Sequence, residues 1–127
     1  MIEEKYISFE TAKLAKEKGF NEHCNHYYDS DRKLNYHDQY ISNSSLNKLY
    51  DLQCYLAPTQ SLLVRWFRET KELHIEVEFW CYMGENYCEY TYDISKPHEG
   101  VDKDVLWFNT YEEAMEAGLQ EALKLIF

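Results

Sequence analysis

Glycine, proline and positive charge are scarce in this sequence. Only 4 glycines and 2 prolines occur among 127 residues, and 13 lysines and arginines stand against 23 aspartates and glutamates, a formal net charge of −10. So few glycines argue against a glycine-rich loop that cradles phosphates. The negative charge disfavours direct nucleic-acid binding, because affinity for the phosphate backbone comes largely from lysine and arginine. Basic protein surfaces, metal cations and small ligands remain as partners.

Long apolar runs are also missing. No stretch approaches the roughly 18 consecutive apolar residues of a membrane-spanning helix. The opening segment Met1–Lys5 is acidic, where an export signal is basic and then apolar. We therefore expect a cytoplasmic protein without membrane association. Its 4 cysteines are expected to be reduced, because cytosolic thiols rarely pair.

Aromatic residues, by contrast, are abundant. The chain holds 12 tyrosines, 6 phenylalanines and 3 tryptophans, which make up 17% of its residues. With the bulky aliphatic residues they supply enough apolar surface for one core. The composition therefore predicts a single domain over residues 1–127.

Three segments show the apolar spacing of amphipathic helices, namely residues 9–18, 59–72 and 110–126. Ser8 is placed to cap the first helix, and Gly19 is placed to end it. In the third helix, Thr110 and Glu113 form a T-x-x-E capping box. The sequence thus predicts three helices.

Residues 73–94 predict an antiparallel hairpin. Apolar and polar residues alternate from Leu73 to Met83 and again from Cys88 to Ile94, the pattern of strands with one buried face. A two-residue turn at Gly84–Glu85 pairs residues whose numbers sum to 169 and leaves the apolar residues on one side. A shift by one residue would mix the two faces.

The remaining segments give weaker patterns. Short strands are predicted at residues 27–28, 34–41, 50–56 and 105–108, the last of them buried, and loops at 42–45 and 95–104. Helices and strands that each have one apolar side are best satisfied by stacking the two types. We therefore predict an α+β fold of two layers, with three helices packed on one face of a small antiparallel sheet.

Cys81 and Cys88 face one another in this hairpin register. The predicted turn places them at a hydrogen-bonded pair, with Cα atoms about 5.5 Å apart, a distance that permits a disulfide. The expected reducing compartment favours the other interpretation, in which both are small buried apolar residues.

The polar face of the hairpin is the predicted partner-binding site. From residue 72 to residue 93 it carries no lysine or arginine, and the register sets Glu76 against Asp93, a like-charge pair that costs stability. Aromatic residues beside acids are typical of surfaces that bind a basic partner. The site residues are Glu76, Glu78, Trp80, Tyr82, Tyr87, Glu89 and Asp93. Alternatively, residues 21–55 cover Trp80 and Tyr82, and the acids only keep a sheet edge soluble.

Cysteine and histidine cluster once, as His23-Cys24-Asn25-His26, with His37 and Cys54 further on. These are zinc-ligand types, but no C-x-x-C, H-x-x-x-H or H-E-x-x-H spacing is present. Cys24 is also the only thiol with a candidate base close in sequence. We predict no metal, cofactor or catalytic residues here, and keep a zinc- or Cys/His-dependent hydrolase as an alternative.

Three stretches of the chain resemble small proteins encoded by phages and prophages of gut Bacteroides-type bacteria, namely Ile7–Phe20, Leu56–Glu69 and Asn109–Ala114 with Leu123–Ile126. The likeness covers both ends and the central helix. It implies an intracellular phage or mobile-element setting and carries no site residues. By analogy, a partner in such a setting is a host protein.

The functional hypothesis is a non-enzymatic acidic protein that binds a basic protein surface. A homodimer of this protein is one oligomeric state that the hypothesis allows. The first alternative is a protein that sequesters a nucleotide-like ligand among tyrosines 27, 28, 36 and 90. The hydrolase centred on Cys24 and His26 is the second.

Overall fold

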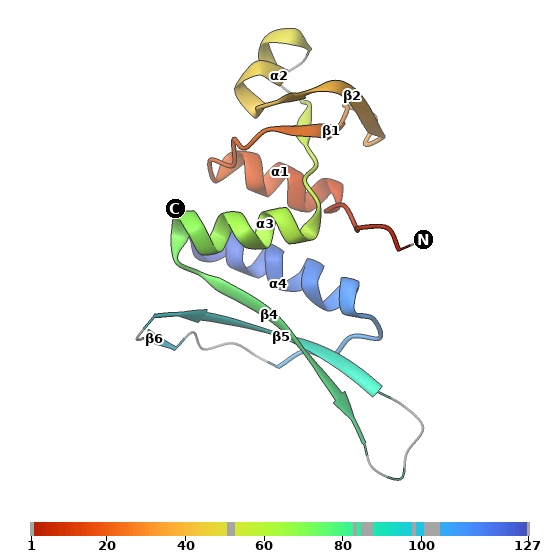
Figure 1. Cartoon of the computed structure of the whole chain (residues 1–127), viewed down its shortest axis with the longest axis vertical. Coiled ribbons are helices and arrows are strands. Elements are labelled where there is room, and N and C mark those ends of the chain that lie inside the picture. Colours follow the sequence, from red (N-terminus) through yellow and green to blue (C-terminus); the bar gives the residue numbers. More distant parts are fainter. Residues whose placement is uncertain are drawn as a thin grey trace. The chain divides into compact units, whose positions relative to one another are not determined.

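The computed structural model describes residues 2–50, 53–82, 84, 88–97, 99–100 and 105–126. Among these residues the chain forms four α-helices, one π-helical segment and two three-stranded antiparallel sheets (Figure 1). The α+β class is confirmed. The prediction of three helices on one small sheet is wrong, because the strands divide between two sheets and a further helix forms.

The chain divides into two compact units, Met1–Leu63 and Val64–Ile126. The first contains α1 (Phe9–Glu17), α2 (Asn43–Leu49) and a sheet in the order β2 (Leu34–Ile41), β1 (Cys24–Tyr28), β3 (Tyr55–Leu56). The second contains β4 (His74–Cys81), β5 (Cys88–Lys96), β6 (Glu99–Gly100) and α4 (Tyr111–Leu125). Helix α3 (Gln60–Trp66) contains the boundary residues Leu63 and Val64, and the π-helical segment η1 (Phe67–Lys71) belongs to the second unit. The single domain stays a prediction.

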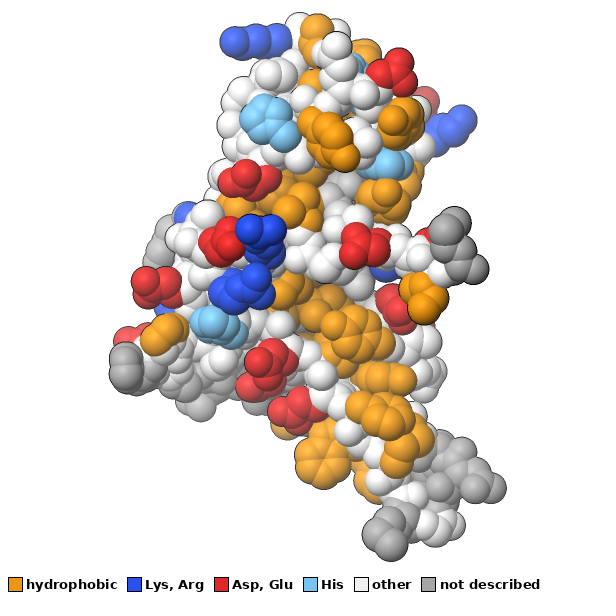
Figure 2. Space-filling model, in the orientation of Figure 1, with side chains coloured by type: hydrophobic (Ala, Val, Ile, Leu, Met, Phe, Trp, Pro, Cys, Tyr) orange, Lys and Arg blue, Asp and Glu red, His pale blue; other side chains and the backbone are white. Residues whose placement is uncertain are grey.

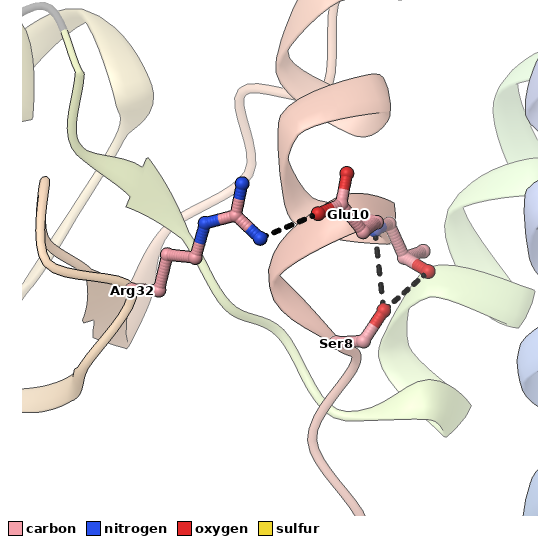
Figure 3. A network of polar contacts seen from close by, with 4 residues as sticks. Ser8, Glu10 and Arg32 are labelled. Atoms are coloured by element: carbon pink, nitrogen blue, oxygen red, sulfur yellow. Dashed lines mark hydrogen bonds and ion pairs between the residues drawn. The ribbon is translucent and has the colours of Figure 1, made fainter.

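Both predicted ends of α1 are confirmed. The Ser8 hydroxyl accepts a hydrogen bond from the Thr11 N–H at 3.3 Å (Figure 3). At the other end Gly19 adopts a φ of +93°, and the Phe20 N–H donates to the Ala15 carbonyl at 2.9 Å. This is the Schellman arrangement, which satisfies carbonyls that the helix itself leaves unpaired. Phe20 is then directed into the core, where it is buried.

The turn between β1 and β2 is tied to α1 by Arg32. This residue has a φ of +64°, and its guanidinium pairs with the Glu10 carboxylate at 3.1 Å (Figure 3). The same guanidinium lies 4.8 Å from the centre of the Phe9 ring. Because both charged side chains are largely exposed, the ion pair contributes little free energy and mainly orients the turn.

Helix α2 corrects the loop predicted at residues 42–45. Ser42 caps it by accepting from the Ser45 N–H at 3.3 Å. The buried Asn43 side chain donates to the Phe20 carbonyl at 2.7 Å and accepts from the Leu56 N–H at 3.1 Å. Hydrogen bonds to distant segments therefore hold this short polar helix in place, and the local sequence does not predict it. Of the strand predicted at 50–56, only β3 forms, and residues 51 and 52 lie outside the described part.

The helix predicted at residues 59–72 is present as α3 followed by η1. An i,i+4 ion pair joins the exposed side chains of Arg65 and Glu69 at 3.0 Å. Glu72, with a φ of +55°, ends the helical run and turns the chain into β4. The loop predicted at 95–104 is shorter than expected, since β5 continues to Lys96 and pairs with β6. Residues 98 and 101–104 lie outside the described part.

Candidate functional site

The predicted hairpin register is confirmed over its whole described length. Strands β4 and β5 pair from His74 with Ser95 to Cys81 with Cys88, and every pair sums to 169. The like-charge pair Glu76–Asp93 therefore exists. Of the two predicted turn residues, Gly84 has a φ of +82°, in the left-handed region that favours glycine. Glu85 lies outside the described residues.

The apolar face of the hairpin is covered by α4 at one end. Ile75, Tyr92 and Ile94 are buried there. Helix and strands approach so closely at Gly118 that a Cβ atom on this glycine would lie 3.0 Å from the Tyr92 Cβ. Figure 1 shows the loop end of the hairpin extending past α4. The same face is therefore a core at one end and open at the other, where Phe79 is 57% exposed.

Cys81 and Cys88 form a disulfide at this open end, with Cα atoms 4.2 Å apart. Our prediction of two reduced, buried cysteines is wrong in both respects, since both residues are exposed. The predicted hydrogen-bonded position is wrong too. The Tyr90 N–H and carbonyl bond to Phe108, at 2.9 and 2.8 Å, so they point away from β4. By alternation the Cys81–Cys88 pair is also not hydrogen-bonded, and such pairs have Cα atoms only about 4.5 Å apart.

The disulfide removes the reason for expecting reduced thiols. Disulfides are rare in the cytosol, where glutathione and thioredoxin keep thiols reduced. Among the described residues no helix is both long enough and apolar enough to cross a membrane. A cytoplasmic location stays a prediction.

The opposite face of the hairpin, which we call the outer face, carries the predicted site residues. Glu76, Glu78 and Trp80 are exposed along β4. Glu89 and Asp93 are half-buried on β5, and the Glu89 carboxylate accepts from the Tyr82 hydroxyl at 3.3 Å. Tyr87, the remaining predicted residue, lies outside the described part. The structure thus brings six of the seven predicted residues to one hairpin.

Segment Val105–Phe108 was predicted as a buried strand, and that prediction is wrong. Only Phe108 pairs with a strand, through its bridge to Tyr90, whereas Val105 is 60% and Trp107 is 41% exposed. The Trp107 ring meets the Trp80 ring edge to face, with centroids 6.4 Å apart. Sequence reasoning therefore missed Val105 and Trp107 in this segment, because an apolar run after a loop is also the signal of a core strand. It also missed Thr91 and Tyr92, which line the same pocket.

These residues enclose a pocket of about 280 Å³ on the second unit. Its lining combines two indole rings, two carboxylates and a buried hydroxyl, and consists of Glu78, Trp80, Thr91, Tyr92, Asp93, Val105 and Trp107. On the visible face, Figure 2 shows hydrophobic side chains along the hairpin with acidic side chains next to them. The pocket is thus both aromatic and negatively charged.

Thr91 is the unsatisfied group of this pocket. The residue is 6% exposed, and its hydroxyl oxygen has no hydrogen-bond partner among the described residues. A buried polar group without a partner costs free energy, and this oxygen is itself inaccessible from the surface, so the cost is internal to the fold. Glu78 is already oriented, because its carboxylate accepts from the Trp80 indole N–H at 3.3 Å.

Such a lining suits a cation that carries N–H donors. The face of an indole ring attracts a positive charge within about 6 Å, and carboxylates add direct electrostatic attraction. A lysine ammonium has three donors and no acceptor, so it can donate to the carboxylates of the lining. The volume of about 280 Å³ lies just below the range of roughly 300–1,000 Å³ typical of small-molecule sites. A single side chain therefore fits better than a nucleotide.

The alternative site around Cys24 does not have the features of a reactive thiol. Burial, followed by the charge of Glu22, raises the pKa of the Cys24 thiol to about 12. The thiolate that acts as nucleophile or zinc ligand is therefore strongly disfavoured at neutral pH. The His26 ring packs against Tyr6 at 4.3 Å and hydrogen-bonds Asn25 at 3.0 Å. Within the described residues, no three of histidine, cysteine, aspartate and glutamate are grouped to hold a metal ion.

The tyrosines of the predicted ligand concavity each have contacts of their own. Tyr28 donates to the Ile7 carbonyl at 2.6 Å, Tyr27 stacks on Tyr50, and Tyr36 meets the His26 ring edge to face. All of these lie in the first unit, whereas Tyr90 belongs to the second. Tyr27 and Tyr28 are half-buried, whereas Tyr36 is 61% exposed.

Comparisons with known proteins found no relative. No protein-family model matches the chain, and no curated protein or solved structure is significantly similar to it. The functional argument therefore depends on the site alone.

Proposed function

We propose that this chain is a non-enzymatic interaction protein that binds a basic protein surface through the outer face of the β4–β5 hairpin. A lysine or arginine of the partner enters the pocket beside Trp80 and Trp107. The observation that carries the proposal is this pocket, whose lining combines two indole rings and two carboxylates. A phage or mobile-element setting with a host protein as partner belongs to the same proposal, as does a cytoplasmic location.

Hot spots at protein interfaces are typically tryptophan, tyrosine and arginine side chains at the centre of a patch. Trp80 and Trp107 have this position, with Glu78 and Asp93 beside them. The acids have a second role, since the net charge of −10 attracts a basic partner before contact. Ring contacts then provide affinity, and charge provides selection and rate.

The test is titration of the protein with a lysine-rich peptide in a calorimeter. Replacing Trp80 by alanine is expected to weaken binding at least about tenfold, because it removes a central ring. Trp80→Phe keeps a ring and is expected to lose less. Glu78→Gln is compared with Glu17→Gln, since both raise the formal charge from −10 to −9 but Glu17 is exposed on the first unit. The proposal would be refuted if Glu78→Gln and Glu17→Gln changed the affinity for the peptide equally and Trp80→Ala left it unchanged.

A further inference from the structure

Strand β4 has an open edge. The sheet order is β4-β5-β6, so β4 has β5 on one side and no strand of the described chain on the other. The edge is regular, because the pairing from His74 to Cys81 contains no bulge. It also contains no proline and no lysine, the residues that commonly protect such edges.

The backbone groups that face this edge can be assigned. Tyr90 directs its N–H and carbonyl to Phe108, away from β4. Phe79, opposite Tyr90, is therefore not hydrogen-bonded to β5, and its backbone groups point to the open edge. Because the direction alternates along a strand, Ile75, Val77 and Cys81 present theirs in the same way.

We propose that the β4 edge binds an extended basic segment of the partner as an added antiparallel strand, with alternating basic and apolar side chains. The inference rests on the proposed function and specifies the partner's form. Basic side chains of the added strand lie on the outer face beside Glu76 and Glu78. Apolar side chains lie on the other face beside Val77, which is half-buried, and Phe79, which is 57% exposed.

Pocket and edge act together in this geometry. Adjacent strands are about 4.8 Å apart, a distance that an extended lysine side chain spans. A lysine next to Glu78 therefore reaches across β4 into the pocket, whose lining includes Trp80 and Asp93. Backbone hydrogen bonds supply affinity, and the charged pocket selects the basic side chain.

A second copy of the chain is disfavoured at this edge. Antiparallel pairing of two β4 strands centred on Val77 would set Glu76 of one copy opposite Glu78 of the other. Like charges directly opposite each other destabilise a sheet. The acids thus exclude self-pairing and favour a basic strand.

The experiment uses the full chain and a peptide that alternates lysine and valine, in three forms. One form is unmodified, one is N-methylated on every valine, and one is N-methylated on every lysine. In antiparallel pairing the valines direct their N–H groups at β4 and the lysines direct theirs away. Methylation of the valines is expected to weaken binding at least about tenfold, and methylation of the lysines to change it less than about threefold.

Equal effects of the two methylated forms would overturn the added strand. If binding then still depended on Trp80 and on Glu78 rather than Glu17, the proposed function would survive without it. A peptide whose binding ignores Trp80 and Glu78 contradicts the proposed function itself. Greater loss on lysine methylation would support an added strand and overturn its antiparallel direction. A free protein that sediments as a dimer resistant to the peptide would show that a second copy occupies the edge, and would overturn the proposal.

Discussion

At the scale of single residues, the four cysteines differ in what surrounds each sulfur. Cys24 and Cys54 are buried free thiols, whereas Cys81 and Cys88 are exposed and joined. Burial disfavours the charged thiolate, so the pKa of Cys24 rises and the thiol becomes inert. Cys24 and Cys54 therefore serve as packing residues, and Cys81 and Cys88 serve as a crosslink.

We predict that Cys24 resists alkylation by iodoacetamide at about pH 8 in the folded protein and reacts after unfolding. The folded thiol has the higher pKa, so its contribution to stability is complete below about pH 9. That contribution is lost as the pH rises toward the folded value of about 12. Mass spectrometry of the alkylated peptides measures the reaction. Labelling of folded Cys24 as fast as in denaturant would contradict a buried, protonated thiol.

Gly118 is a second residue whose surroundings decide its role. Glycine-to-alanine changes inside a helix normally stabilise it by about 0.5–1 kcal/mol. Here the new Cβ would lie 3.0 Å from the Tyr92 Cβ and 3.2 Å from an Ile75 methyl, so we expect a net loss of about 1 kcal/mol from overpacking. Urea denaturation measures it, with Glu121→Ala on the same helix as the control. A higher urea midpoint for Gly118→Ala than for the unmodified protein would contradict this prediction. It would show that Tyr92 and Ile75 shift to make room for the methyl group.

At the scale of elements, the hairpin has different environments along its length. Near Ile75 and Ile94 the apolar face is buried against α4, and near Phe79 it is exposed. The exposed end has little packing to hold the strands together. There the Cys81–Cys88 disulfide closes the hairpin covalently.

Reducing that disulfide is therefore predicted to loosen the loop end and leave the α4 end intact. A crosslink that closes so short a loop contributes at most about 2.5 kcal/mol in the chain-entropy model. Hydrogen exchange at the Trp80 and Glu89 amides is expected to accelerate in a Cys81→Ser/Cys88→Ser variant, while exchange at Glu76 and Asp93 changes little. Uniform acceleration along the hairpin, or none, would contradict this prediction.

At the scale of the whole molecule, charge is the dominant property. The formal charge of −10 acts on any approaching partner over a distance that salt sets, about 10 Å at 0.1 M ionic strength. Packing cannot explain why β4 and β5 carry acids opposite one another, since that arrangement costs stability. The proposed function would account for the arrangement, because opposed acids attract a basic partner.

We predict that the association rate with the lysine–valine peptide falls at least about tenfold between roughly 0.05 and 0.5 M NaCl, while the dissociation rate changes less. Long-range attraction is screened by salt, but ring contacts in the pocket are not. Stopped-flow fluorescence of the tryptophans measures both rates. An association rate that is independent of salt would show that charge does not guide the encounter.

The sequence alone determined what depends on neighbours along the chain. It determined the α1 cap at Ser8, the helix end at Gly19, and the hairpin register, because hydrogen-bonding geometry and side-chain alternation are local. The six described residues of the predicted site follow from that register. Helix α2 could not be predicted, since the hydrogen bonds of Asn43 to Phe20 and Leu56 join distant segments.

Only the tertiary structure decided how far each face is covered. The period of a strand says which residues share a side, but not whether another element lies over them. Helix α4 stops short of Phe79, so cysteines predicted as buried are exposed and bonded, and Trp107 joins Trp80 instead of entering a core. Burial depends on contacts between segments far apart in sequence, and the pocket is formed by such contacts.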